Sequence, residues 1–166
     1  MDDLHRTAIG RVVPNILGQL AFLFVDSDDP SEATGFSPND EAYLAASLTF
    51  SGPVNGGMMT AFPLSLALEL AANLLGSEND DPKAASHAHD SLGEFLNVAC
   101  GHSLTAIHGA KQVFDLSAPR LFVLTAVEAS ALARKPGSLT YAVDGAPFLF
   151  QASFCNCCAP GEAPHA

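Results

Sequence analysis

The stretch PLSLALELAANLLG, residues 63–76, constrains the fold more than any other part of the sequence. Proline stands at its start, glycine at its end, and almost every position between them is apolar, which predicts a helix. A helix that is apolar on nearly all sides must be buried, so other elements have to surround it. The chain can supply them, because 166 residues with 48% hydrophobic side chains suffice for one domain with a real core.

The other patterns predict an α+β fold in which an antiparallel β-sheet packs against long helices. Helical spacing over residues 3–23 predicts a first helix, with a kink or break at Pro14, and a longer helix is expected over residues 84–107. Two β-hairpins are expected, with their turns at residues 51–57 and 144–145. Since the order helix, hairpin, helix occurs twice, the sequence suggests duplicated α-β-β-α units.

The region between the second long helix and the last hairpin contains shorter patterns. Residues 111–116 and 120–126 resemble strands, and the SAP tripeptide separates them. Residues 128–135 favour a short helix that a Pro-Gly pair closes.

Charge and termini exclude several classes of function. The formal net charge is −11, and such a surface repels phosphate backbones and anionic lipids, so nucleic acid and membrane are excluded as partners. The chain starts MDDLHRTAIGR, with acids where a signal peptide carries bases. Its most apolar run, residues 16–25, is too short to span a bilayer. We therefore expect a cytoplasmic protein.

The four cysteines fit the same compartment. Cys100 stands alone, whereas Cys155, Cys157 and Cys158 crowd near the C-terminus. A disulfide framework would spread its cysteines along the chain, so these are expected to be reduced thiols. A soft-metal site that combines the tail cysteines with Cys100 is the alternative, although C-x-C-C is not a familiar zinc spacing.

A polar ridge on the second long helix is the main candidate site. In DSLGEFLNVACG, residues 90–101, the side chains of Asp90, Glu94 and Asn97 share one side, while Leu96 and its apolar neighbours form the buried stripe. The helix therefore projects a carboxylate and a carboxamide one turn apart. Either this is an ordinary solvated face, or the two side chains reach toward a partner.

The residues around this ridge resemble the CheX-type chemotaxis phosphatases, within the wider CheC, CheX and FliY group. The family motif is an Asp or Ser, three further residues, a Glu, two further residues and an Asn, followed after about twenty-two residues by a Pro. Asp90, Glu94 and Asn97 match it, and twenty-one residues separate Asn97 from Pro119. The resemblance implies a single CheC/CheX-like domain over residues 1–154. Residues 155–166 would be a Cys- and Pro-rich tail.

The resemblance also implies a function. The substrate would be a phosphorylated CheY-like response regulator, whose acyl phosphate sits on an Asp beside a bound Mg²⁺. Asn97 would position the attacking water, and Glu94 would pair with a lysine of the partner. Asp90 is a further partner-binding candidate. The metal would belong to the partner, so the chain itself would need no cofactor or metal of its own.

A module that binds a receiver domain without catalysis is the alternative. Family members often carry Gly immediately before the Asn, where this chain has Leu96. A larger side chain beside the ridge could crowd a docked partner, and the catalytic interpretation fails if Leu96 or a loop covers Asn97.

Other polar clusters favour structural roles. Glu69 and Asn73 are four residues apart rather than three, so they match the motif poorly as a second active site. His87 and His89 lie two residues apart and point away from each other on a helix, which disfavours a metal site. His102 and His108 have no obvious partners in the sequence.

The last hairpin predicts a homodimer. In residues 147–154, phenylalanines alternate with smaller side chains, so one strand face is strongly apolar and requires a cover. We expect a two-fold dimer through residues 139–154, with both Glu94/Asn97 ridges facing outward. The alternative is that the same face is the core of a monomer.

Overall fold

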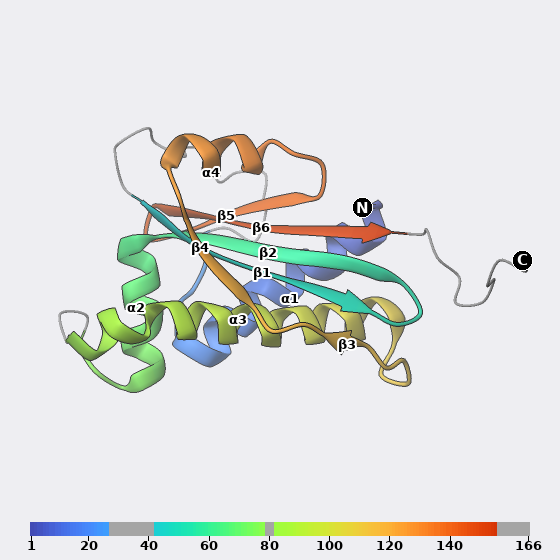
Figure 1. Ribbon diagram of the computed structural model, residues 1–166, viewed down its shortest axis with the longest axis horizontal. Coiled ribbons are helices and arrows are strands. Elements are labelled where there is room, and N and C mark those ends of the chain that lie inside the picture. Colours follow the sequence, from blue (N-terminus) through green and yellow to red (C-terminus); the bar gives the residue numbers. More distant parts are fainter. Residues whose placement is uncertain (27–41, 79–81, 156–166) are drawn as a thin grey trace, which may run out of the picture.

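The computed structural model describes residues 1–26, 42–78 and 82–155 (Figure 1). This part contains four helices and six strands. In chain order they are α1 (Asp3–Ala21), β1 (Tyr43–Ser51), β2 (Asn55–Pro63), α2 (Leu64–Leu75), α3 (Pro82–His108), β3 (Asp115–Leu116), β4 (Arg120–Leu124), α4 (Ala126–Ala133), β5 (Ser138–Val143) and β6 (Ala146–Cys155). None of these helices has the length and apolar character that crossing a membrane requires.

One antiparallel sheet organises the fold, as the sequence predicted. Its strand order is β3-β1-β2-β6-β5, and β4 pairs with β1 on the edge that β3 also uses. Both predicted hairpins form, β1 with β2 and β5 with β6. The two strand-like pieces after α3 pair with β1 and not with each other, and the first of them contributes only two residues.

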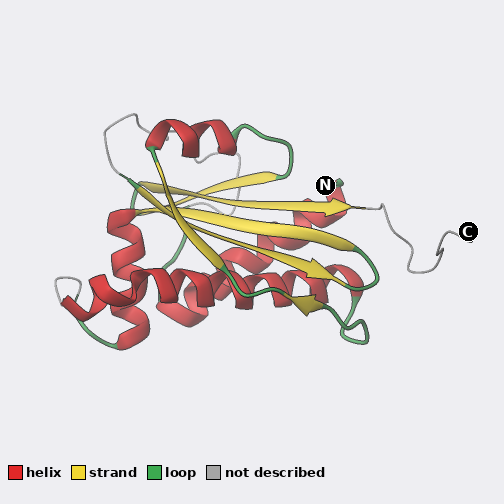
Figure 2. Ribbon diagram, viewed as in Figure 1, coloured by secondary structure: helices red, strands yellow, loops and turns green. Residues whose placement is uncertain are grey.

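The helices cover the two faces of this sheet unequally. Figure 2 shows α1, α2 and α3 on one side and α4 alone on the other. The large core lies between the first three helices and the sheet, and Phe62, Phe95 and Phe150 are fully buried in it. A smaller core beneath α4 contains Tyr43 and Leu149. The molecule therefore has three layers where α4 lies and two layers elsewhere.

The apolar helix that constrains the fold is buried as predicted. α2 runs over Leu64–Leu75, with Pro63 before it and Gly76 after it in the left-handed conformation, at a φ of 63°. Its buried residues face α3, α1 and the sheet. The glycine ends the helix because a residue with a side chain adopts this conformation only at a cost.

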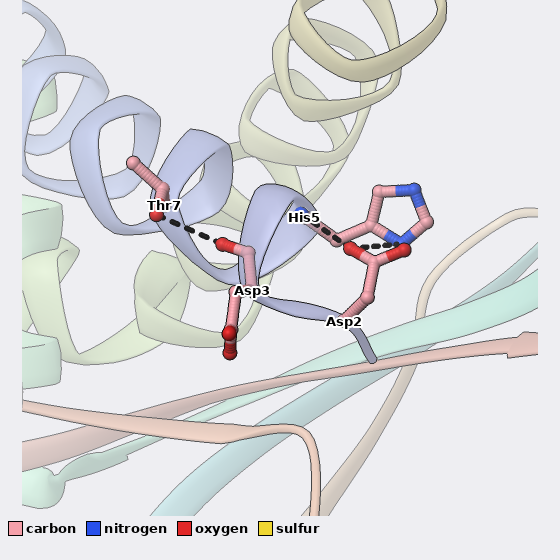
Figure 3. A network of polar contacts seen from close by, with 4 residues as sticks. All are labelled: Asp2, Asp3, His5 and Thr7. Carbon is pink, nitrogen blue, oxygen red and sulfur yellow. Dashed lines mark hydrogen bonds and ion pairs between the residues drawn. The ribbon is translucent and has the colours of Figure 1, made fainter.

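α1 corrects one expectation. The helix continues through Pro14 instead of breaking there. Val13, Ile16 and Leu17 are buried around the proline, so packing against the core maintains the helix despite the lost backbone donor. Figure 3 shows its N-terminus, where the Asp2 carboxylate accepts a hydrogen bond of 2.8 Å from the backbone N–H of His5.

The phenylalanines of the last strand are covered within the chain itself. Phe148 and Phe150 are fully buried against the α1–α3 layer, and Leu149, on the opposite face, is buried under α4. The apolar face that suggested a dimer is therefore core of the folded chain, which is the alternative stated above. The dimer itself stays a prediction.

Candidate functional site

α3 carries the candidate site on a firmly held helix. It is 27 residues long and contacts α1, α2 and β1. Its apolar stripe is buried in the main core, with Leu92, Phe95, Leu96 and Ala99 fully inaccessible to solvent. Because this stripe fixes the rotation of the helix about its axis, the opposite side must face outward.

The predicted ridge lies on that outward side. Asp90 and Glu94 are exposed, and Asn97 is half-buried at the border of the exposed surface. Leu96 points into the core with no exposed surface, so it does not cover Asn97. Among the described residues, no hydrogen bond or ion pair engages the three ridge side chains. A carboxylate and a carboxamide are thus presented one turn apart with their polar atoms available to a partner.

A proline borders the ridge on one side. The segment between β3 and β4 passes beside α3 at Gly93, the residue between Asp90 and Asn97 on the helix surface. A Cβ atom built on Gly93 would lie 3.5 Å from Pro119 Cβ and 3.8 Å from Leu121 Cδ2. The proline that the family motif includes is therefore brought next to the ridge, although it is far away in the sequence.

The Glu69 and Asn73 pair on α2 has a structural role. The side-chain amide of Asn73 donates a hydrogen bond of 2.8 Å to the carbonyl oxygen of Ala21, the last residue of α1. This bond satisfies a carbonyl that the end of a helix leaves without an intrahelical partner. Glu69 is half-buried on the same helix. Asn73 therefore ties α2 to α1 and is not free to hold a substrate.

The candidate metal ligands do not come together. Within the described residues, no three His, Cys, Asp or Glu side chains are grouped closely enough to hold an ion. His87 and His89 are exposed on α3, and Nδ1 of His87 lies 2.9 Å from the carbonyl oxygen of Lys83 in the preceding turn.

The cysteines are separated by burial. Cys100 has no exposed surface, and desolvation raises the pKa of its thiol from 9.0 to about 12. Cys155 is exposed at the end of β6, whereas Cys157 and Cys158 lie outside the described residues. A buried, protonated thiol does not offer the thiolate that a soft metal requires.

His108 has partners that its sequence position did not reveal. At the end of α3 its ring lies 5.9 Å from the ring of His5 and 5.3 Å from that of Phe114, between centroids. Desolvation, and secondarily the charge of His5, lower the pKa of His108. The cluster joins the start of α1, the end of α3 and the loop before β3. These ring contacts depend on the tertiary fold, so no local sequence pattern predicts them. His102 is exposed.

Both a family model and solved structures of known proteins match this chain. The family model described as chemotaxis phosphatase CheX matches residues 44–141. A search of curated proteins finds no match. Solved structures resemble the whole described fold, including a chemotaxis protein CheX from Vibrio vulnificus with a TM-score of 0.64 and 17% identity, over 90% of this chain and 95% of that one.

Two further structures extend the likeness. A CheC-like superfamily protein from a Shewanella species has a TM-score of 0.66 and 14% identity, over 94% of this chain and 100% of that one. The CheX of a CheX–CheY–BeF3–Mg²⁺ complex from Borrelia burgdorferi has a TM-score of 0.61 and 16% identity, over 90% and 97%. At such low identity, these structures establish a shared fold and do not establish a shared activity.

Proposed function

Because the chain belongs to the chemotaxis phosphatase CheX family, we propose that it hydrolyses the aspartyl phosphate of a CheY-like response regulator. The observation that carries the proposal is the ridge on α3. Glu94 and Asn97 face outward without a partner among the described residues, on a helix whose other side is locked in the core. The CheX of Borrelia burgdorferi was crystallised with CheY, BeF3 and Mg²⁺, which supports a receiver domain as the partner.

In this proposal Asn97 holds the attacking water. Hydrolysis of an acyl phosphate needs a water in line behind the phosphorus, and positioning and electrostatics supply most of the acceleration. A carboxamide offers both a donor and an acceptor, so it can orient the water without taking its proton. Asn97 is half-buried and lies one turn after Gly93, the position that Pro119 approaches, and partial burial limits the orientations of its side chain, which suits such a role.

Glu94 serves to dock the partner. Its exposed carboxylate would pair with a lysine beside the phosphorylated aspartate, and the one-turn spacing to Asn97 would set how deeply the carboxamide enters. Asp90, one turn before Glu94, would contribute a second partner contact. Mg²⁺ would be held by the receiver, so this chain would need no metal or cofactor of its own.

Binding without catalysis is the second candidate. The net charge of −11 favours it, because the phosphorylated site of a receiver is also negative and long-range attraction is lacking. Leu96 does not crowd a docked partner, because its side chain is fully buried.

The distinguishing experiment measures the dephosphorylation rate of a panel of phosphorylated receivers as a function of receiver concentration. We expect Asn97→Ala to lower the maximal rate about 100-fold while receiver binding persists. Glu94→Ala should instead raise the half-saturating receiver concentration about tenfold. Thr105→Ala, at an exposed position two turns further along α3, is the control and should behave as wild type. Equal maximal rates for Asn97→Ala and wild type would remove Asn97 from the mechanism.

We also propose that the chain forms a two-fold dimer through residues 139–154 with both ridges outward. Among the described strands, β5 is the last one on its side of the sheet, so its outer edge is open to pairing with a second chain. Light scattering at micromolar concentration should give twice the mass of the chain. A monomer, or a dimer that buries Asn97, would contradict this.

A further inference from the structure

The edge strand β4 exposes apolar side chains that the fold does not need in its core. Leu121 is 37% exposed, Phe122 36% and Val123 61%. Within the described part of the chain, β4 pairs only with β1, so its other edge has no strand beside it. Natural proteins usually protect such edges with charges or prolines, and here Pro119 and Arg120 stand at the start of the strand while the following residues stay apolar. Apolar side chains that stay exposed beside a candidate site favour a role in binding.

The pairing register separates the two faces of β4. Leu121 lies opposite Ala46 and Val123 opposite Leu44, and both of these β1 residues face the α1–α3 layer. Phe122 lies opposite Ala45, which belongs to the smaller core on the α4 side. Because successive side chains of a strand alternate, Leu121 and Val123 are on the side of α3, and Phe122 is on the other side.

The α3 side of β4 is continuous with the ridge. Leu121 Cδ2 lies 3.8 Å from the Cβ position of Gly93, and Pro119 Cβ lies 3.5 Å from it. Gly93 lies between Asp90 and Asn97 on the helix surface, so no other side chain of α3 separates the apolar residues from the polar ones. Because Leu121 approaches α3 one turn before Asn97, we expect a domain that docks over Asn97 to reach Leu121 as well.

We propose that Pro119, Leu121 and Val123 form the apolar half of the docking surface for the phosphorylated receiver. This inference rests on the proposed function. The net charge of −11 gives no long-range attraction to a negative phosphorylated receiver, so such a partner must obtain its affinity from local contacts beside the ridge. Protein interfaces combine an apolar centre with a polar rim, and the ridge alone offers only polar side chains. Leu121 and Val123 are positioning residues in this arrangement, since they touch the receiver away from the phosphate.

The test uses a receiver loaded with beryllofluoride and Mg²⁺ for binding, and the phosphorylated receiver for turnover. Leu121→Ser and Val123→Ser should each raise the dissociation constant and the half-saturating concentration about tenfold, with maximal rates within about twofold of wild type. Phe122→Ser is the matched control, because Phe122 is on the same strand and as exposed as Leu121 but on the opposite face. It should leave both constants within about twofold of wild type. Thermal unfolding checks that all variants fold.

Each outcome decides between the inferences. Unchanged affinity in Leu121→Ser, or an equal loss in Phe122→Ser, overturns the docking surface, even if the protein is an active phosphatase. Binding that depends on Leu121 without any acceleration of dephosphorylation keeps the docking surface and overturns the proposed phosphatase activity. If Leu121→Ser and Phe122→Ser both had a lower molecular mass in solution than wild type, the edge of β4 would be an interface with a second copy of the chain. This result would contradict the proposal. A wild-type protein that binds no receiver overturns both inferences.

Discussion

Replacement of Cys100 by alanine tests whether α3 is seated as described, and with it the outward direction of the ridge. Cys100 follows Asn97 by one turn and is fully buried. Burial raises the pKa of its thiol from 9.0 to about 12, because the thiolate would be excluded from water. In the unfolded chain the thiol loses its proton from about pH 9, whereas in the folded chain it stays protonated. The unfolded state therefore binds fewer protons above this pH, and stability must fall as the pH rises toward 12.

The expected size of the loss follows from the two pKa values. At pH 10 about nine tenths of the thiols are ionised in the unfolded chain and almost none in the folded one, which corresponds to about 1.4 kcal/mol of lost stability. At pH 7.5 the same linkage contributes almost nothing. The loss of stability at pH 10 hardly depends on the pKa of Cys100 in the folded chain, since any pKa above about 11 gives nearly the same loss.

The assay is urea denaturation under reducing conditions at pH 7.5 and pH 10. Between the two pH values, the free energy of unfolding should fall by about 1.4 kcal/mol more in wild type than in Cys100→Ala. Any stability that the variant loses through the cavity left by the thiol is the same at both pH values and cancels. All other titrating groups are common to both proteins and cancel in this comparison. Cys155→Ala removes an exposed thiol and is the control. A pH-independent difference between wild type and Cys100→Ala would show that Cys100 is not buried and that α3 is rotated.

Three further substitutions test other parts of the structure. Asn73→Ala removes the bond to the carbonyl of Ala21, so it should cost about 1 kcal/mol in urea denaturation and leave phosphatase activity unchanged; lost activity would indicate a second active site. Thr125→Ala breaks the capping box with Glu128 at the start of α4 and should also cost about 1 kcal/mol, and an unchanged midpoint would contradict the cap. Tyr141→Phe removes a buried hydroxyl that has no hydrogen-bond partner among the described residues, so thermal unfolding should show equal or higher stability. A loss above about 1 kcal/mol in Tyr141→Phe would reveal a partner for that hydroxyl.

The sequence predicted what depends on local pattern and periodicity. The apolar helix between Pro63 and Gly76, the long α3 and both hairpins formed near the expected residues, because their spacing and turn residues act over a few positions. The ridge on α3 followed from the same spacing. Of the kink or break expected at Pro14, the break is wrong, because α1 continues through the proline and the packing around it depends on tertiary contacts.

What the sequence left open depends on which surfaces meet. Alternation in the last strand indicated an apolar face, yet the pattern is the same whether a second chain or the chain's own helices provide the cover. The structure places Phe148 and Phe150 under α1–α3. The approach of Pro119 to Gly93 and the ring contacts of His108 join segments far apart in the chain, and no local pattern encodes them.

The uneven layering of the sheet implies a gradient of hydrogen exchange. Where α4 covers the outer face, Tyr43 and Leu149 are buried, whereas Thr49 and Ser153 at the other end are exposed. Amide protons should therefore exchange first at the two-layer end, because less structure has to open there. α3 contacts two helices and the sheet, so its amides should be among the slowest. We therefore expect the ridge to open late, so that its side chains keep their spacing between one encounter with a partner and the next.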